Sequence, residues 1–441
     1  MVGTMERAAP ICSCGADRLD RRELLRRGAA VGFGLPLLGA LGASCSDGGE
    51  NAGARRLNAV CLEWVLRLYP QLAAIGSSPP ALEIAGPTRF FFAAHNGVPA
   101  AEIYIGLTPF AELVPLVNQG LLAPWDGTMP GAVADDVPLP IRREATLNGR
   151  MYSWPFLLDV TILGWNSELL ERAEIDPGTV PRTWDELIEA SRMVVRRGAA
   201  PYGCTFDPRP WRSLVPVTYS FSTRVFDEHG RFDYVSDAAV AALETLRRMK
   251  ELANPDLLEA GLSTGAGLTP DEGAFAAGLA AYYVKYQNAH IRNAATWPDP
   301  GQLVLARLPR PPGGAGKTVF WTTGIGLVRL GSDRPAAARY ARSLTYADDF
   351  WEAALGGRGA AGQLPVFNSL WASWRDDPPP WLDWAANVKA QLGHAEAIPA
   401  SRVGLSQFKR AQRELDRYLS GEEPNALRAL KRADAATPRT R

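Results

Sequence analysis

Short apolar segments alternate with helical ones along the chain from Leu57 onward, and this alternation constrains the fold most. Strand-like runs cover residues 57–64, 81–85 and 102–106, and the run 109–122 has apolar residues at helical spacing. Such alternation is typical of βαβ units, in which consecutive strands run parallel and helices cover the faces of the sheet. We therefore expect an α/β fold built on a parallel sheet.

One later helix is specified in detail by the stretch PRTWDELIEAS, residues 181–191. Thr183 precedes an apolar stripe and is followed three residues later by Glu186, which together form a capping box. Gly198 ends the stripe and predicts the end of the helix. We expect Trp184 to pack inside the protein, because it lies on the apolar face of this helix.

The N-terminus predicts export rather than a folded domain. Residues 1–45 combine the pair Arg21-Arg22, in a twin-arginine-like pattern, with an uncharged run that ends at Ser46. Cys45 follows the apolar run and resembles the acylated cysteine of bacterial lipoproteins. We expect residues 46–55 to tether a lipid-anchored protein to the outer side of a membrane in the cell envelope. A membrane helix that is kept in the mature protein is the alternative.

Charge argues against polyanionic partners. The chain has 47 basic and 47 acidic residues, and removal of residues 1–45 leaves 41 and 43. This balance favours neither nucleic acid nor an anionic surface as a partner. The chain also has 13 Trp residues, whose rings serve either core packing or the binding of ring-shaped ligands.

Cysteine and histidine usage indicates neither a metal nor a cofactor. Cleavage at Cys45 leaves only Cys61 and Cys204, which could pair in an exported protein or remain two buried free thiols. The four His are scattered and form no HExxH pattern, so we expect no catalytic metal. The stretch PPGGAGKT, residues 311–318, leads into a strand-like run rather than a helix, so we do not expect it to bind phosphate.

Enzyme motifs are equally weak. GLSTG, residues 261–265, fits the pattern G-x-S-x-G, but a nucleophile elbow needs a strand before it and a helix after it. Loop sequence lies on both sides here. We therefore expect no catalytic residue at this position.

The segment 149–203 resembles, along its whole length, the family 1 extracellular solute-binding proteins of ABC importers, of the sugar-binding type. The motifs that carry the resemblance are a Gly-to-Pro strand, an aromatic-Asn strand end, a Pro-x-Thr-Trp-Asp-Glu-Leu helix start and a Tyr-Gly pair: Gly149 to Pro155, Trp165-Asn166, Pro181 to Leu187, and Tyr202-Gly203. Shorter similar segments extend the resemblance over nearly all of the mature chain.

The resemblance implies two α/β lobes with a ligand cleft between them and three hinge crossings, near 156–157, 317 and 362. The implied division of the chain is: lobe 1, 56–156 and 317–362; lobe 2, 157–316 and 363–435; a disordered tail, 436–441. Ligands of parallel sheets bind beyond the carboxyl ends of the strands, so the cleft should lie at those ends.

Nine residues are candidates for ligand contact, because they lie at strand ends, near the hinge or in aromatic positions: Glu63, Trp64, Thr108, Trp154, Asp159, Trp211, Tyr286, Trp321 and Arg402. Trp64 and Trp154 could stack on a sugar ring or pack in the core. Asp159 could accept a ligand hydroxyl or serve as a hydrogen-bonding group at the hinge. Arg402 is the one base that could bind an anion.

We therefore expect a non-enzymatic protein that captures a small, neutral carbohydrate for the permease subunits of an ABC importer. Aromatic faces would bury the apolar side of a sugar, and carboxylates would accept hydrogen bonds from its hydroxyls. The same fold could instead serve as a ligand-sensing subunit. An exported enzyme that acts on glycans is the third possibility.

Overall fold

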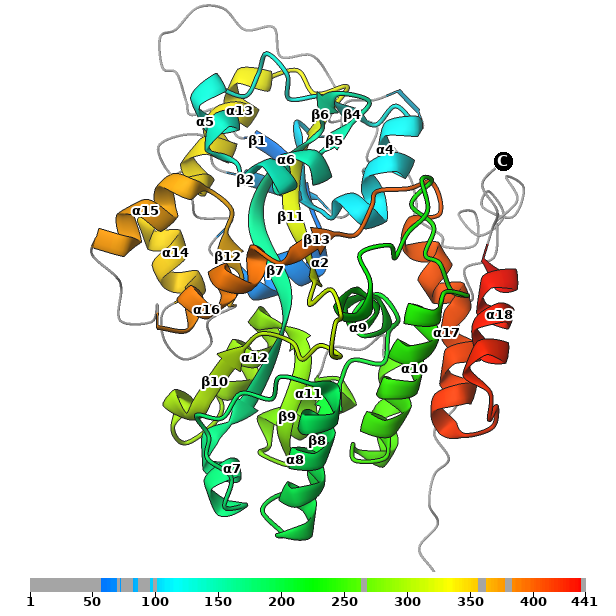
Figure 1. The fold of residues 1–441 in the computed structure, drawn as a ribbon. Coiled ribbons are helices and arrows are strands. Elements are labelled where there is room, and N and C mark those ends of the chain that lie inside the picture. The colour runs from blue at the N-terminus through cyan, green and yellow to red at the C-terminus, as the bar shows by residue number, and fades with distance from the viewer. Residues whose placement is uncertain are drawn as a thin grey trace, which may run out of the picture. The chain divides into compact units, whose positions relative to one another are not determined.

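The computed structural model describes residues 57–69, 72, 82–85, 96–97, 101–262, 268–355, 362–376 and 383–437 (Figure 1). The expected export signal, Cys45, the tether and residues 438–441 lie outside the described residues, as does Ser263 of the GLSTG stretch. The described residues all belong to one unit, 54–441.

Three parallel strands begin the fold, as the alternation predicted. Strand β1 (Leu57–Cys61) lies between β2 (Leu82–Ala85) and β3 (Ile103–Leu107) and runs parallel to both. The next strand of the sheet, β11 (Thr318–Val328), is antiparallel to β3. The sheet is therefore mixed rather than purely parallel.

Strand β7 (Ser153–Asn166) joins two sheets into one continuous path, as its long course in Figure 1 shows. Its first part pairs antiparallel with β11, and its last part pairs antiparallel with β9 (Ala280–Tyr286) and β10 (Leu303–Ala306). Strand β8 (Tyr202–Phe206) then pairs parallel with β9. All 14 residues of β7 are buried, in keeping with a mostly apolar sequence that Asp159 and Thr161 interrupt.

Short strands complete the sheets. They are β4 (Leu122–Ala123), β5 (Thr146–Leu147), β6 (Arg150–Met151), β12 (Leu364–Pro365) and β13 (Ala395–Ala397). Strand β4 pairs with the end of β11, and β13 pairs with its beginning. Strands β5 and β6 form a separate two-stranded sheet.

Two large hydrophobic cores define two lobes, in agreement with the predicted fold class. We call lobe 1 the residues that pack around β1, β3 and the first part of β7, and lobe 2 those that pack around β8, β9 and the end of β7. Helices cover lobe 1: α2 (Glu63–Leu68), α4 (Val114–Asn118), α5 (Gly131–Asp136), α6 (Leu139–Glu144), α13 (Arg334–Thr345), α14 (Asp348–Leu355), α15 (Asn368–Asp376) and α16 (Asp383–Leu392). A π-helical segment, Pro109–Leu113, leads into α4.

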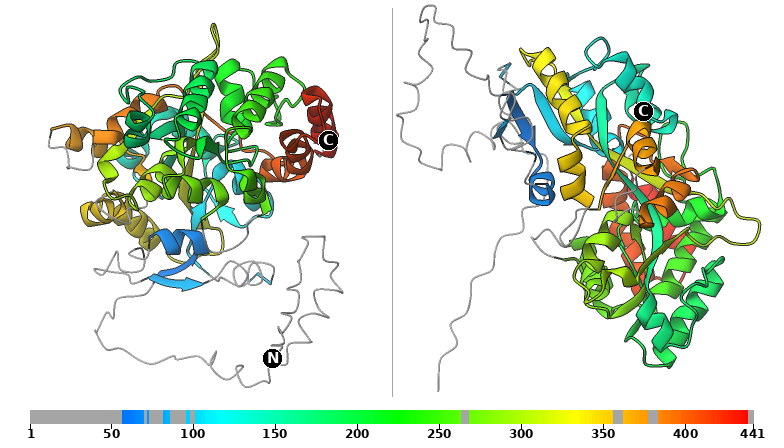
Figure 2. Two further views of the ribbon diagram at one scale, coloured as in Figure 1. Left: turned by 90° about the horizontal axis from the view of Figure 1, so that it is seen from below. Right: turned by 90° about the vertical axis from the view of Figure 1, so that its left-hand side faces the viewer.

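Lobe 2 has its own layer of helices, which face the reader in the view from below in Figure 2. They are α7 (Ser167–Arg172), α8 (Trp184–Arg196), α9 (Leu214–Phe221), α10 (Asp237–Lys250), α11 (Pro270–Ala276), α12 (Gln287–Ala294), α17 (Gly404–Ser420) and α18 (Ala426–Ala436). One 3₁₀ segment, Pro255–Leu262, lies between α10 and α11, and another, Pro300–Gln302, lies between α12 and β10. Helix α10 packs against both α17 and α18.

Local signals placed the starts of several helices correctly. Thr183 caps α8 by accepting a hydrogen bond from the N–H of Glu186, 3.1 Å away. The Glu186 carboxylate accepts from the N–H of Arg182. Asn166 caps α7 in the same way, through Leu169. Trp184 is buried on the core face of its helix, as expected.

Two local expectations are wrong. The expected strand 57–64 ends at Cys61, and α2 begins at Glu63 and buries Val65 in the lobe 1 core. The disordered tail was expected to begin at residue 436, but α18 continues to Ala436 and Thr437 is buried.

Strand β12, helix α15 and Val388 pack differently from the lobe boundaries that the sequence suggested. Strand β12 pairs with Leu157 and Leu158 of β7, and the Trp371 and Trp374 side chains of α15 lie in the lobe 1 core. The large apolar rings of α15 complete that core, whereas the expected division placed 363–435 in lobe 2. The chain enters the lobe 2 core with Ile398 and α17.

Both cysteines that the structure describes are free and buried. Cys61 lies in the lobe 1 core and Cys204 in the lobe 2 core, so they cannot pair. Burial raises the pKa of each thiol to about 12. None of the described helices is long and apolar enough to cross a membrane.

Candidate functional site

A cavity of about 500 Å³ lies where the two lobes meet, and we call it the cleft. Lobe 1 contributes Leu62 and Thr108, which follow the carboxyl ends of β1 and β3. Lobe 2 contributes Tyr286 at the end of β9 and Arg292 from α12. The cleft therefore lies beyond strand ends, where ligands of α/β sheets bind.

An aromatic cluster forms one wall of the cleft. Trp321 of β11 lies at its centre, with its ring centroid 5.2 Å from that of Trp211 and 5.4 Å from that of Tyr286. Phe110 lies 5.3 Å from Trp211 and packs in the lobe 2 core, although its chain segment follows β3 of lobe 1. Edge-to-face contacts of this kind fix the ring orientations.

Six of the nine predicted residues line the cleft: Trp64, Thr108, Asp159, Trp211, Tyr286 and Trp321. Asp159 and Trp321 are direct cross-strand partners on β7 and β11, so strand pairing alone brings two of them together. Trp64 lies on α2 and is partly buried. The remaining three residues lie elsewhere.

Trp154 is a core residue, contrary to the stacking role considered for it. Its side chain has no exposed surface, and its indole N–H donates to Oγ1 of Thr345 over 2.9 Å. Its ring packs edge-on against Trp125, with centroids 5.2 Å apart. Glu63 and Arg402, both exposed, do not line the cleft either. Glu63 begins α2 instead of ending a strand.

Asp159 connects the two lobes through amide side chains. Its Oδ2 accepts from Nε2 of Gln363 over 2.6 Å, and its Oδ1 accepts from Nε2 of Gln287 over 3.3 Å. Gln363 in turn accepts from the Tyr69 hydroxyl of lobe 1, and Gln287 begins α12 of lobe 2. Burial raises the pKa of Asp159 to about 7, against the opposing hydrogen bond from Gln363.

The structure also places two arginines in the cleft that the sequence did not single out. The Arg212 guanidinium lies over the rings of Trp211 and Tyr286, 4.2 and 4.7 Å from their centroids. It donates to Asp207 over 2.9 Å. Arg292 lines the cleft as well and donates to Glu272 over 2.9 Å. The sequence suggested Arg402 as the one base for an anion, whereas Arg212 and Arg292 are the arginines that line the cleft.

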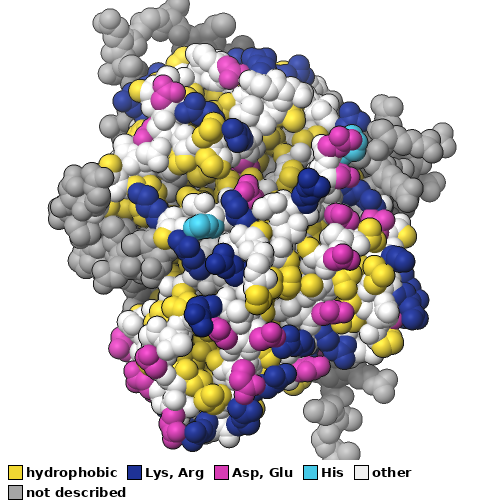
Figure 3. Space-filling view, in the orientation of Figure 1, with side chains coloured by type: hydrophobic (Ala, Val, Ile, Leu, Met, Phe, Trp, Pro, Cys, Tyr) yellow, Lys and Arg dark blue, Asp and Glu magenta, His cyan; other side chains and the backbone are white. Residues whose placement is uncertain are grey.

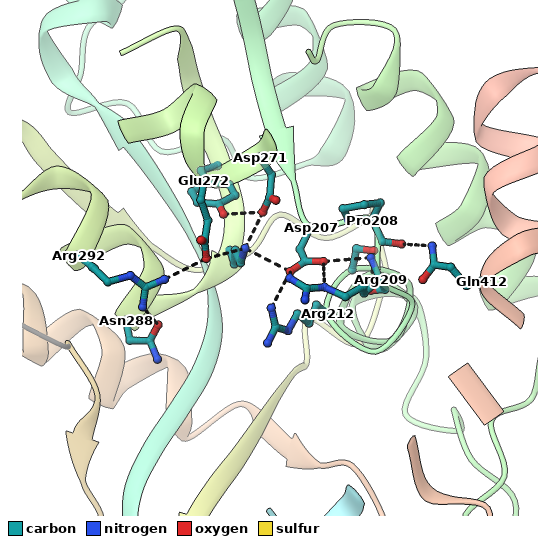
Figure 4. A network of polar contacts seen from close by, with 12 residues as sticks. Asp207, Pro208, Arg209, Arg212, Asp271, Glu272, Asn288, Arg292 and Gln412 are labelled. Carbon is teal, nitrogen blue, oxygen red and sulfur yellow. Dashed lines mark hydrogen bonds and ion pairs between the residues drawn. The ribbon is translucent and has the colours of Figure 1, made fainter. Parts of the chain in front are cut away.

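A buried ion network behind the cleft holds these arginines (Figure 4). Nζ of Lys285 lies 2.6 Å from Asp271, 3.0 Å from Glu272 and 3.2 Å from Asp207, all of them carboxylate oxygens. The Arg209 side chain adds two hydrogen bonds to Asp207, of 2.7 and 2.5 Å. Each carboxylate therefore has at least one cationic partner, as buried charges require.

The network fixes the protonation of its carboxylates. Burial would raise the pKa of Asp207, but the charges of Arg209, Lys285 and Arg212 outweigh burial and hold that pKa well below its ordinary value. In Glu272 the charges of Lys285 and Arg292 likewise overcome burial and lower the pKa to about 2. Both carboxylates are therefore ionised at neutral pH.

No sequence pattern predicted this network. Its carboxylates and cations lie between positions 207 and 292 on a loop, two helices and a strand, so only the fold brings them together. The one local signal is the spacing of Asn288 and Arg292 on α12, four residues apart, which puts both on the cleft face. Among the described residues no group of three or more His, Cys, Asp or Glu could hold a metal ion.

Charges of both signs are interspersed on the face shown in Figure 3, with no large patch of one sign. This surface agrees with the balance of 47 basic and 47 acidic residues in the chain. This face therefore has no charged patch that would attract a strongly charged ligand over a long range.

Solved structures show the same fold. The chain superimposes on a Thermotoga lettingae ABC transporter solute-binding protein bound to α-D-tagatose with a TM-score of 0.70 and 16% identity, over 87% of this chain and 99% of that one. The maltose-bound MalE3 of T. maritima gives 0.66 and 19%, over 86% and 98%. An Agrobacterium vitis solute-binding protein with D-mannitol gives 0.65 and 17%, over 86% and 96%. These likenesses confirm a two-lobed fold.

Curated relatives match over shorter segments. A probable amino-acid ABC transporter periplasmic-binding protein of Sinorhizobium fredii is 30% identical over 26% of this chain and 28% of its own length. An sn-glycerol-3-phosphate-binding periplasmic protein of Rhizobium meliloti is 33% identical over 32% and 31%. The chain thus matches less than a third of the length of either relative.

The family model for bacterial extracellular solute-binding proteins matches residues 90–346, which is more than half of the chain. That span includes β3, β7, β9 and β11 and most of the cleft wall. The chain therefore belongs to the family of bacterial extracellular solute-binding proteins.

Proposed function

We propose that the protein captures a small, neutral carbohydrate in the cleft and delivers it to the permease subunits of an ABC importer. The observation that carries this proposal is the aromatic wall of Trp211, Tyr286 and Trp321 beside the hydrogen-bonding groups of Asp159 and Asn288. Ring faces bury the apolar side of a sugar, and the polar groups satisfy its hydroxyls. The maltose-, tagatose- and mannitol-bound structures of similar fold support this ligand class.

Charge compensation favours a neutral ligand. Arg212 and Arg292 line the cleft, but each already donates to a buried carboxylate, Asp207 and Glu272. An added anion would gain only part of the attraction of a free guanidinium. The proposal also takes the protein to be non-enzymatic, in keeping with its family.

An anionic solute is the second candidate. Arg212, Arg292 and Lys409 all line the cleft, and the Rhizobium meliloti relative binds sn-glycerol-3-phosphate. Guanidinium groups are the usual partners of phosphate in proteins. These three cations could therefore bind a phosphate group, and ligand screening must include phosphate esters.

A thermal-shift screen over neutral sugars, polyols, sugar phosphates and amino acids, followed by calorimetry, tests the proposal. Trp64→Ala should weaken binding of a neutral sugar by about 1–3 kcal/mol, because it removes one ring face from the cleft. Arg402→Ala is the control and should leave affinity unchanged, since Arg402 is exposed and outside the cleft. Tight binding of a phosphate ester alone would replace the neutral-sugar proposal by the second candidate.

Export and anchoring belong to the same proposal. Export would place the cleft outside the cytoplasm, and a lipid on Cys45 would keep the protein near its permease. Cys45→Ala should move the protein from the membrane fraction to the soluble fraction, because an acyl anchor supplies the membrane affinity. Identical fractionation of both forms would contradict the anchor.

A further inference from the structure

A second cavity, of about 1130 Å³, extends away from the cleft along α17, and we call it the α17 groove. Its floor includes Leu405, Lys409, Gln412, Asp416 and Ser420. These residues recur every three or four positions and so occupy one face of the helix. At 1.5 Å per residue, that face is about 22 Å long.

The α17 groove adjoins the cleft. Trp211, Leu405 and Lys409 line both cavities. The start of α17 lies close to the cleft, since a Cβ at Gly404 would lie only 3.1 Å from the Phe110 carbonyl oxygen. The two cavities together exceed the roughly 300–1,000 Å³ of an ordinary small-ligand site.

The Asp416 carboxylate lines the groove and can accept further hydrogen bonds. It is partly buried and accepts from Nε2 of Gln412 over 2.7 Å, but it forms no ion pair with any described residue. Burial raises the pKa of its carboxyl to about 6. A partly buried carboxylate without a cation is stabilised by further hydrogen-bond donors.

Other groups along the groove suit the same ligand chemistry. Gln412 uses its amide N–H groups on Asp416 and on the Pro208 carbonyl, a contact that Figure 4 shows, which leaves its amide oxygen as an acceptor. Arg209 donates to Asp207 through Nε and Nη2, which leaves Nη1 as a donor. Leu258 and Trp211 supply apolar surface beside these groups. Apolar surface flanked by both acceptors and donors fits a chain of sugar rings.

We propose that the α17 groove binds the outer rings of an oligosaccharide whose first ring lies in the cleft. This inference rests on the proposed function and makes it more specific: the ligand is a neutral oligosaccharide rather than a monosaccharide. The Asp416 carboxylate accepts hydrogen bonds from ring hydroxyls, and Trp211 spans the junction between the first and later rings.

Calorimetry with mono-, di- and tetrasaccharides from α-1,4-glucan, β-1,4-glucan and β-1,4-mannan series tests the inference. In the series that binds, the tetrasaccharide should bind at least about tenfold more tightly than the monosaccharide. Asp416→Ala should weaken tetrasaccharide binding about tenfold and leave monosaccharide binding unchanged, because it removes one charged acceptor. Gln412→Trp, which fills the groove, should have the same selective effect.

Glu414→Ala is the matched control, because Glu414 is a carboxylate of the same helix that does not line the groove. It should change neither affinity. Affinity that is independent of chain length, or an Asp416→Ala effect that is equal for both sugars, would overturn the inference and leave the proposed function standing. Failure of every carbohydrate to bind would overturn both.

Discussion

Two sets of buried carboxylates lie close to the cleft and differ in their partners. Asp207, Asp271 and Glu272 of lobe 2 share cations with Lys285 at their centre. Asp159 and Glu144 are equally buried, but their hydrogen bonds come from neutral groups. The difference therefore isolates the effect of the partner from the effect of burial.

The partners decide the protonation state. Cations hold the pKa of Asp207 well below its ordinary value, despite burial. Thr322 donates to Glu144, and Gln363 donates to Asp159. Because these donors are neutral, the effect of burial is larger than that of the hydrogen bonds. Burial raises the pKa of Glu144 to about 8 and that of Asp159 to about 7. Lobe 2 thus has a permanently charged support behind its two cleft arginines, whereas Asp159 of β7 and Glu144 of α6 titrate near neutral pH.

The largest effect is expected from Lys285→Met, which would break the charged set. This change leaves three buried carboxylates without their shared cation and should lower the free energy of unfolding by about 3–5 kcal/mol. Denaturant unfolding followed by circular dichroism measures it. Lys317→Met is the control, because its pair with Glu396 is partly exposed and should contribute less than about 1 kcal/mol. An equal loss of unfolding free energy in Lys285→Met and Lys317→Met would show that the Lys285 network does not stabilise lobe 2 as described.

A smaller effect concerns the pH dependence of stability. Because the pKa of Asp159 is raised from 3.8 to about 7, the folded protein binds more protons than the unfolded chain between about pH 4 and pH 7. The contribution of Asp159 to stability is therefore lost as pH rises through this window. In Asp159→Asn this loss should be absent, so the variant should gain stability relative to the natural protein between pH 5 and pH 8.

Thermal unfolding of both proteins across that range gives the comparison. Asp207→Asn is the matched control, since the pKa of Asp207 is lowered and its carboxylate stays ionised throughout. Asp207→Asn should destabilise the protein by a constant amount between pH 5 and pH 8. If stability depends on pH in the same way in Asp159→Asn and in the natural protein, the raised pKa of Asp159 is contradicted.

The smallest effect is expected from Glu144→Gln. At pH 6 the Glu144 carboxyl is mainly protonated, because its pKa is about 8. An amide can keep both contacts with Thr322, the N–H bond of 3.1 Å and the hydroxyl bond of 2.7 Å. The free energy of unfolding at pH 6 should therefore change by less than about 1 kcal/mol. A loss of several kcal/mol would mean that Glu144 is ionised and paired like Asp207.

The sequence predicted the features that depend on neighbouring residues. The Thr183 cap and the apolar stripe of α8 are local patterns, and the mostly apolar sequence of β7 matches its complete burial. Strand alternation predicted an α/β fold, and the family resemblance implied two lobes with a cleft between them, which strand ends placed at one edge of the sheets. Trp321 and Asp159 were predicted separately, and the register of β11 on β7 makes them neighbours.

Features that depend on three-dimensional packing were not predictable in this way. Trp64 and Trp154 look alike in sequence, yet Trp64 lines the cleft and Trp154 lies in the core, because periodicity does not tell which apolar side chain meets solvent. Arg212 and Arg292 are ordinary bases until the fold brings Asp207 and Glu272 to them. Arg402, the base that was singled out, lies outside the cleft.

The most direct test of the account is a crystal structure of the protein with the carbohydrate that gives the largest thermal shift. The account predicts a sugar ring in the cleft, in contact with Trp64 of lobe 1 and with the Trp211–Tyr286–Trp321 wall, while Arg212 keeps its bond to Asp207. A sugar bound outside the cleft would contradict the account. So would an anion held by Arg212 and Arg292 after both had left their carboxylates.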